Sequence, residues 1–287
     1  MSKIEVPKVK LNNGVYMPAL GYGTFRIDPK DTYECVRNAL DVGYRMIDTA
    51  EYYQNEEAVG KAIKDSGIPR DEIFITSKVW LTNFGEKQTT ETIQGILKRL
   101  QTDYVDLLLI HQPFNDYYGA YRALESAYRQ GKARAIGVSN FYVDRFIDLA
   151  FHADIVPQVN QMETHIYNQQ KELQKYLNKT GTKLEAWGPF AQAKMGLFED
   201  ENLIPIAKKH DKTVAQVALR YLHQRDIIVI PKTTHKERMK ENIDIFDFKL
   251  SAEEMATISK LDRKETVGKS HRDPERVLST IDKKLVE

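Results

Sequence analysis

The sequence is poor in several features that would place it in a class at once. Cys35 is the only cysteine among 287 residues, so no disulfide can form within the chain, and a reducing compartment is expected. The N-terminus lacks the apolar core of a secretion signal, and no apolar run is long enough to span a bilayer. The 42 basic and 41 acidic residues give no support for nucleic acid or a membrane as the main partner. We therefore expect a cytoplasmic monomer that acts on a small molecule.

Motifs of several catalytic classes are also missing. The seven histidines include no His-x-His and no His-Glu-x-x-His, so the sequence predicts no metal site and argues against a metal-dependent hydrolase. No Gly-x-Ser-x-Gly occurs, and Cys35 lies inside a helical pattern, which disfavours a nucleophilic hydrolase. The segment from Gly21 to Arg26 lacks the third glycine of the dinucleotide-binding fingerprint, which argues against an open doubly wound sheet.

A regular alternation of strand and helix patterns is present instead. Asn12-Asn13-Gly14 between two short apolar runs predicts an N-terminal β-hairpin. Apolar runs that end in polar or glycine residues then predict strands at 19–23, 45–48, 73–78, 104–110, 133–138, 155–159, 183–187 and 227–230. An Asp31/Glu34 capping box predicts the start of the first helix, and Gly43 predicts its end. Amphipathic patterns predict further helices at 55–65, 92–100, 117–130, 143–151, 169–179, 203–210, 214–224 and 236–245.

Each predicted strand is followed by a helix, which is the pattern of a closed parallel sheet. The length fits one domain, and no linker or change of composition divides residues 1–287. We predict a single α/β domain, a (β/α)8 TIM barrel with an N-terminal β-hairpin. A Ser251/Glu254 capping box predicts an extra C-terminal helix that ends near Leu261, and the tail at 262–287 is expected to be partly irregular.

Polar or aromatic residues stand at the ends of seven of these strands. In barrels of this type the chemistry lies at the C-terminal ends of the strands, so one shared rim is expected to hold them. They are Asp48, Lys78, His111, Ser139 with Asn140, Asn160 with Gln161, Trp187 and Lys232. Any one of them has an ordinary explanation as a cap or a packed polar group, but the whole set on one rim indicates a functional site.

The residue types at this rim suggest a reduction. A phenol is a weak acid, with a reference pKa of about 10. The ammonium of Lys78 is expected to lower that pKa for Tyr53 and make it a general acid, while Asp48 pairs with Lys78 and offsets the cost of burying its charge. His111 can orient a carbonyl oxygen. Such a set protonates a developing alkoxide, and the hydride that completes a carbonyl reduction requires a nicotinamide cofactor.

Four segments closely resemble the aldo-keto reductases: 43–56, 136–141, 159–161 and 230–242. The likeness runs from about Val9 to Leu261 and is greatest to bacterial members similar to 2,5-diketo-D-gluconate reductase. It implies an NADPH-dependent carbonyl reductase of small aldehydes and ketones, such as ketosugars and dicarbonyls. It also implies that Tyr53 is the general acid, Lys78 and Asp48 its tuning pair, and His111 the residue that orients the substrate.

The resemblance further implies a set of cofactor contacts. Ser139, Asn140 and Gln161 match positions that hold the nicotinamide carboxamide, and Trp187 matches the aromatic residue that stacks on the ring. Lys232, Thr233 and Arg238 match contacts to the 2′-phosphate; a cation pair beside a helix N-terminus suits a phosphate on charge grounds alone. The remaining expected cofactor contacts are Gly23, Thr24, Asp48, Gly188, Phe190, Thr234, Glu241 and Asn242.

The substrate side is less clearly defined by the sequence. Tyr22, Tyr53, Trp80 and His111 are expected to contact the substrate, and Phe114, Tyr117 and Tyr118 either add to an aromatic wall or pack elsewhere. His271 and Arg272 either cover the site or are solvated. Gln112, Ile166 and the 188–191 segment depart from the usual family pattern, which leaves the shape of the substrate and pyrophosphate pockets open. The alternative function is an NADP(H)-binding redox sensor or regulatory subunit without turnover, which would not need all four catalytic residues.

Overall fold

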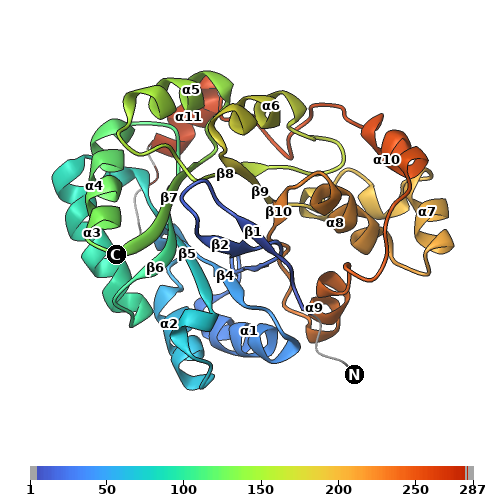
Figure 1. The fold of residues 1–287 in the computed structure, drawn as a ribbon, viewed down its shortest axis with the longest axis horizontal. Coiled ribbons are helices and arrows are strands. Elements are labelled where there is room, and N and C mark those ends of the chain that lie inside the picture. The colour runs from blue at the N-terminus through green and yellow to red at the C-terminus, as the bar shows by residue number, and fades with distance from the viewer. Residues whose placement is uncertain (1–4, 282, 284–287) are drawn as a thin grey trace.

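A closed barrel of eight parallel strands forms the centre of the molecule (Figure 1). The computed structural model describes residues 5–281 and 283. The strands are ordered β10-β9-β8-β7-β6-β5-β4-β3. The first and last strands meet through hydrogen bonds from Gly21 N to Val229 O (2.9 Å) and from Val229 N to Ala19 O (3.1 Å), which close the sheet. The predicted (β/α)8 barrel is therefore confirmed.

The barrel strands follow the predicted order with one correction. They are β3 (Tyr22–Gly23), β4 (Met46–Asp48), β5 (Phe74–Val79), β6 (Val105–Ile110), β7 (Ala133–Ser139), β8 (Val159–Glu163), β9 (Lys183–Trp187) and β10 (Ile228–Val229). The strand predicted at 155–159 is wrong, because β8 begins at Val159 and carries Asn160 and Gln161 within it. Pro157 has no N–H to give to a ladder, and the interior side of β8 is polar at the rim, which hid the strand from an apolar pattern.

Helices cover the outside of the barrel. They are α1 (Pro29–Val42), α2 (Glu56–Asp65), α3 (Glu86–Leu100), α4 (Tyr117–Arg129), α5 (Val143–His152), α6 (Lys171–Thr180), α7 (Leu203–Lys209), α8 (Val214–Gln224), α9 (Lys236–Ile243), α10 (Ala252–Ser259) and α11 (Pro274–Ile281). None of them has the length and apolar character that crossing a bilayer requires, as far as the described residues extend.

Two helix signals in the sequence have different outcomes. The Ser251/Glu254 capping box is present, with hydrogen bonds of 2.7 and 3.2 Å between the two residues. The Asp31/Glu34 box is wrong: α1 starts at Pro29, and the Asp28 side chain caps it by accepting from Lys30 N at 3.1 Å. Proline fits the first turn of a helix, where its missing N–H costs nothing, so the helix starts earlier than the box suggested.

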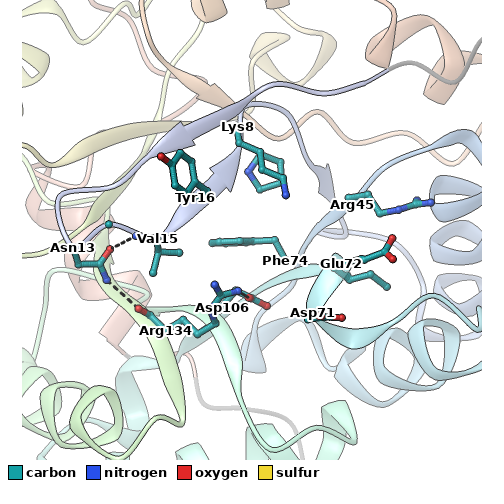
Figure 2. A pocket seen from close by; sticks show the side chains of 13 residues that line it. Lys8, Asn13, Val15, Tyr16, Arg45, Asp71, Glu72, Phe74, Asp106 and Arg134 are labelled. Carbon is teal, nitrogen blue, oxygen red and sulfur yellow. Dashed lines mark hydrogen bonds and ion pairs between the residues drawn. The ribbon is translucent and has the colours of Figure 1, made fainter.

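The N-terminal end of the barrel is closed by the hairpin of β1 (Lys8–Lys10) and β2 (Tyr16–Pro18). A pocket of about 430 Å³ lies next to it, and Figure 2 shows Phe74 among the side chains that line this pocket. Asn13 in the hairpin turn donates to Arg134 O at 3.0 Å. Buried Asp106 pairs there with Arg70 and Arg134, each at 2.8 Å. These contacts tie the hairpin and the strand ends together, as expected for the stabilising end of such a barrel.

The barrel interior changes character along the strands. Side chains of a strand alternate between its two faces, so residues two apart share a face. Met46, Phe74 and Val159 belong to an apolar cluster inside the barrel. Two or four residues further along the same strands stand Asp48, Lys78 and Gln161, all buried. The alternation that packs the core therefore aims polar groups inward at the opposite end.

Candidate active site

The centre of the rim is a buried ion pair. Lys78 is fully buried, and its Nζ lies 2.7 and 2.8 Å from the two carboxylate oxygens of Asp48 and 2.8 Å from Thr49 O. Burial opposes the charged form of Lys78, but the interactions with Asp48, Tyr53 and Glu185 together outweigh it and leave the pKa of Lys78 above its ordinary value. The ammonium is therefore permanently charged and held in one place.

The phenol of Tyr53 lies next to this ammonium. Tyr53 ends a short 3-10 turn at Glu51–Tyr53, and its Oη is 3.4 Å from Lys78 Nζ. The pKa of Tyr53 is raised to about 12, because burial disfavours the phenolate more than the Lys78 charge favours it. The expectation that Lys78 brings this pKa below its ordinary value is wrong for the net effect, since burial dominates. Tyr53 consequently keeps its proton at physiological pH.

His111 presents a neutral ring to the same space. Its ring centroid lies 5.6 Å from that of Tyr53 and 5.1 Å from that of Trp80. Burial, reinforced by the Lys78 charge, lowers the pKa of His111 well below its ordinary value. The buried Nδ1 has no hydrogen-bond partner among the described residues. A hydrogen there would be unsatisfied, so the neutral ring carries it on Nε2, which is the form that can donate to a carbonyl oxygen.

Glu185 is a part of this cluster that the sequence analysis missed. It is fully buried in β9, and Gln161 Nε2 donates to it at 2.9 Å and to Asp48 at 2.8 Å. Burial, followed by the Asp48 charge, raises the pKa of Glu185 to about 8. The signal was available: a carboxylate stands inside the otherwise apolar strand 183–187, on the same face as Trp187. By accepting from Gln161 Nε2, Glu185 fixes the direction of the Gln161 amide.

Asn140 joins the catalytic end to Trp187. It follows β7 in a left-handed conformation (φ 67°), which asparagine tolerates better than most residues. Its Nδ2 donates to His111 O at 3.1 Å, and its Oδ1 accepts from Trp187 Nε1 at 3.0 Å. Ser139 Oγ donates to Gln161 O at 3.0 Å. These contacts hold the indole and the carboxamide-binding candidates in one fixed arrangement.

One cleft of about 1340 Å³ brings most of the predicted site residues together. Its lining includes Gly23, Asp48, Tyr53, Trp80, His111, Ser139, Asn140, Gln161, Trp187, Gly188, Phe190, Lys232, Thr233, Arg238, Glu241 and Asn242. Lys78 lies behind this surface. Thr24, predicted as a cofactor contact, is buried and donates to Asp48 O at 2.9 Å, and Thr234 is exposed outside the lining.

Several aromatic residues expected on the substrate wall lie elsewhere. The Tyr22 ring is buried against Tyr44, and its hydroxyl donates to Thr233 O at 2.5 Å, so the prediction that it contacts substrate is corrected. Tyr117 opens α4 and packs edge-on against Phe141, while Tyr118 and Phe114 are also outside the lining. The side of each ring that faces the core depends on packing, which a strand-end position does not reveal.

The C-terminal segment covers one side of the cleft. Trp80 Nε1 donates to Lys283 O at 2.9 Å, and Val267 N donates to Glu163 Oε1 at 2.6 Å. His271 lines the cleft, and its ring stacks on Phe114. Arg272 instead pairs with Asp144 at 2.9 Å outside the cleft. The tail thus contains α11 and a cover over the site beside the irregular chain that was expected in part of it.

The other side of the cleft suits a phosphate. Lys232 and Arg238 line it, and neither has an ion pair among the described residues. Lys236 and Lys240 in the same helix do pair, with Asp41 (3.6 Å) and Glu237 (2.9 Å). A nicotinamide dinucleotide phosphate requires cations for its phosphate, an acceptor for its carboxamide and a surface on which its ring can stack. Lys232 with Arg238, the Gln161 amide oxygen and the Trp187 indole provide these groups, so the residues present fit that cofactor.

Comparison with known proteins agrees with this geometry. The model of the aldo/keto reductase family matches residues 17–263. Glyoxal reductase of Bacillus subtilis is 49% identical over 91% of this chain and 94% of its own, and methylglyoxal reductase DkgA of Yersinia pestis is 41% identical over 94% and 96%. The solved structure of a Bombyx mori aldo-keto reductase in complex with NADP aligns with TM-score 0.88 and 34% identity, covering 93% of this chain and 96% of that one.

The fold and the cleft define a barrel oxidoreductase that uses a nicotinamide cofactor. The chain belongs to the aldo/keto reductase family. It is an NADP-dependent reductase of carbonyl groups, and the predictions of family, reaction class and cofactor are confirmed.

Proposed function

We propose that this cleft reduces small aldehydes and ketones, dicarbonyls such as glyoxal and methylglyoxal among them, with NADPH as the hydride source. The names of two relatives, a glyoxal reductase and a methylglyoxal reductase, support this range of substrates. The observation that carries the proposal is the contact of 3.4 Å between the Tyr53 phenol and a buried, fixed ammonium.

The cofactor supplies the hydride, and the side chains supply the proton and the orientation. His111, neutral and with its hydrogen on Nε2, donates to the substrate carbonyl oxygen and holds it near Tyr53. As negative charge develops on that oxygen, the Tyr53 hydroxyl transfers its proton to it. The phenolate that remains lies 3.4 Å from Lys78 Nζ, and this positive charge stabilises it. Asp48 keeps the ammonium in place.

The cofactor contacts are proposed from the same geometry. Both Gln161 amide hydrogens are used by the carboxyl groups of Asp48 and Glu185, so its oxygen remains to accept from a carboxamide. Trp187 lines the cleft with its ring held by Asn140, in a position suited to stacking. Lys232 and Arg238 take the 2′-phosphate, and Glu241 and Asn242 line the cleft beside them for the adenine end. We also propose that the chain acts as a monomer in the cytoplasm, which light scattering after gel filtration and cell fractionation would test.

Steady-state oxidation of NADPH tests the function. A panel of methylglyoxal, glyoxal, ketosugars and oxo acids is expected to give turnover with at least the dicarbonyls. Tight NADPH binding without turnover on the whole panel would instead support the redox sensor, the alternative that the intact Asp48, Tyr53, Lys78 and His111 argue against.

A further inference from the structure

Arg276 is an unpaired cation in the cleft wall. It lies in α11, lines the cleft, and is half-buried. Its Nε is shielded from solvent and has no hydrogen-bond partner, and no ion pair of the described residues includes it. A buried guanidinium N–H without an acceptor is unfavourable, so the site is incomplete as it stands. A ligand that brings an acceptor would complete it.

The contacts of the C-terminal segment place Arg276 on the substrate side. Burial, followed by the charge of Arg276, lowers the pKa of His271 to about 3, and the neutral His271 ring lines the cleft. The segment is connected to the catalytic residues through Trp80. Its Nε1 donates to Lys283 O, and its ring lies 5.1 Å from that of His111. Arg276 therefore lines the cleft on the same side as Trp80, His111 and His271.

The phosphate-binding candidates lie on a different part of the rim. Lys232 follows β10 and Arg238 lies in α9, which packs against α1. Figure 1 shows α11 beside α5, across the barrel from α9. A cofactor phosphate held by Lys232 and Arg238 therefore leaves Arg276 free for a second anion.

The acids near Arg276 are already engaged. Asp273 Oδ1 accepts from the backbone N–H groups of Glu275 and Arg276 and lies 3.9 Å from Lys269 Nζ. Glu163 accepts from Val267 N and contacts His165. Arg145, which lies over the Phe114 ring, is a second cation on this side, and beyond the effect of burial it lowers the pKa of His271 together with Arg276.

We propose that Arg276 determines specificity by binding the carboxylate of an anionic carbonyl substrate, an oxo acid or an aldehyde acid, whose carbonyl lies at Tyr53 and His111. A guanidinium fork matches a carboxylate in shape and charge, and such charge-assisted bonds are stronger than neutral ones. The inference rests on the proposed carbonyl reduction and names a substrate class for it. Glyoxal and methylglyoxal carry no carboxylate, so they would not use this contact.

A matched pair of substrates tests the proposal: succinic semialdehyde, which is an anion, and its methyl ester, which is neutral. With NADPH saturating, Arg276→Gln is expected to lower kcat/KM for the acid by roughly 10- to 100-fold, the value of a charge-assisted bond. For the ester the change is expected to stay within about 3-fold, as for a surface substitution. Arg276→Lys keeps the charge without the fork and should lie between these values for the acid. Arg272→Gln, in the same segment but outside the cleft, is the control and should treat both substrates as the wild type does.

Each outcome decides between the two proposals. Equal losses on acid and ester would show that Arg276 acts structurally, and an unchanged kcat/KM for the acid would show that it does not bind the carboxylate; either overturns the inference while the reductase function stands. If the wild-type protein reduces neither succinic semialdehyde, nor its methyl ester, nor methylglyoxal, the proposed function itself fails. Circular dichroism and NADPH affinity of Arg276→Gln are expected to match the wild type, which separates a specificity effect from misfolding.

Discussion

Asp48 and Glu185 share one hydrogen-bond donor, the Gln161 amide nitrogen, at 2.8 and 2.9 Å. Lys78 neutralises Asp48 directly, whereas Glu185 has no direct bond to a cation within the described chain. The two carboxyl groups therefore differ in role. Asp48 fixes the ammonium that serves Tyr53, and Glu185 helps to fix the amide that is proposed to receive the cofactor.

Replacing Glu185 by Gln should change how stability depends on pH. The pKa of Glu185 is raised by folding from 4.5 to about 8, so the folded state favours the protonated form. Its contribution to stability is full below the unfolded pKa and is lost as pH rises through the folded pKa. Gln keeps an acceptor for Gln161 and does not titrate. The Tm of Glu185→Gln minus that of the wild type should therefore rise between pH 5 and pH 8.5.

The control for this experiment is Glu253→Gln, at an exposed position in α10. Its Tm should follow the wild type at every pH. A Glu185→Gln variant whose Tm also runs parallel to the wild type would show that Glu185 has no raised pKa in the folded protein.

Arg238→Ala should weaken the binding of NADPH but not of NADH. Arg238 has no ion pair in the described structure, so its removal breaks none, while a charge-assisted bond to the 2′-phosphate is stabilising by about 1.5–3 kcal/mol. Titration of each cofactor measures this. Lys240→Ala, in the same helix but paired with Glu237, should leave both affinities unchanged. Equal losses for the two cofactors in Arg238→Ala would mean that Arg238 acts on the fold.

NADPH should quench the fluorescence of the protein mainly through Trp187. The two tryptophans, Trp80 and Trp187, both line the cleft. Trp80 stacks on Tyr52 with ring centroids 3.9 Å apart and donates to Lys283 O, whereas Trp187 packs on the inner apolar cluster of the barrel and donates from Nε1 to Asn140. Stacking on the nicotinamide is favourable by about 0.5–1.5 kcal/mol beyond area burial. Trp187→Phe should remove most of the saturable quench and keep binding; a quench lost in Trp80→Phe alone would contradict the assignment.

The sequence predicted the barrel and the inner side of its rim, and particular residues explain why. Strand alternation and strand ends are local signals, so the pattern of residues alone was enough to place Asp48, Lys78, His111 and Gln161 together. Glu185 was visible as a charge in an apolar strand, yet its partner 24 residues earlier, Gln161, belongs to a strand that the apolar pattern misplaced.

Properties that depend on tertiary packing were not predicted. The raised pKa of Tyr53 comes mainly from burial by chain segments far apart in the sequence, which no local pattern reports. Tyr22 stands near a strand end, but its ring turns toward Tyr44 and away from the cleft. The tail has weak periodicity because α11 packs only part of its surface, leaving Leu278 59% exposed, so neither this helix nor Arg276 could be placed from the sequence.

The most direct test of the account is the rate of methylglyoxal reduction by Tyr53→Phe. The central claim is that Tyr53 gives the proton, and general acid catalysis contributes roughly 10²–10⁴-fold. The variant should therefore lose at least about 10²-fold in kcat. Its affinity for NADPH, followed by the Trp187 quench, should stay near that of the wild type, because the phenol acts on the substrate. Near-normal turnover of methylglyoxal by Tyr53→Phe would contradict the claim and require another proton donor in the cleft.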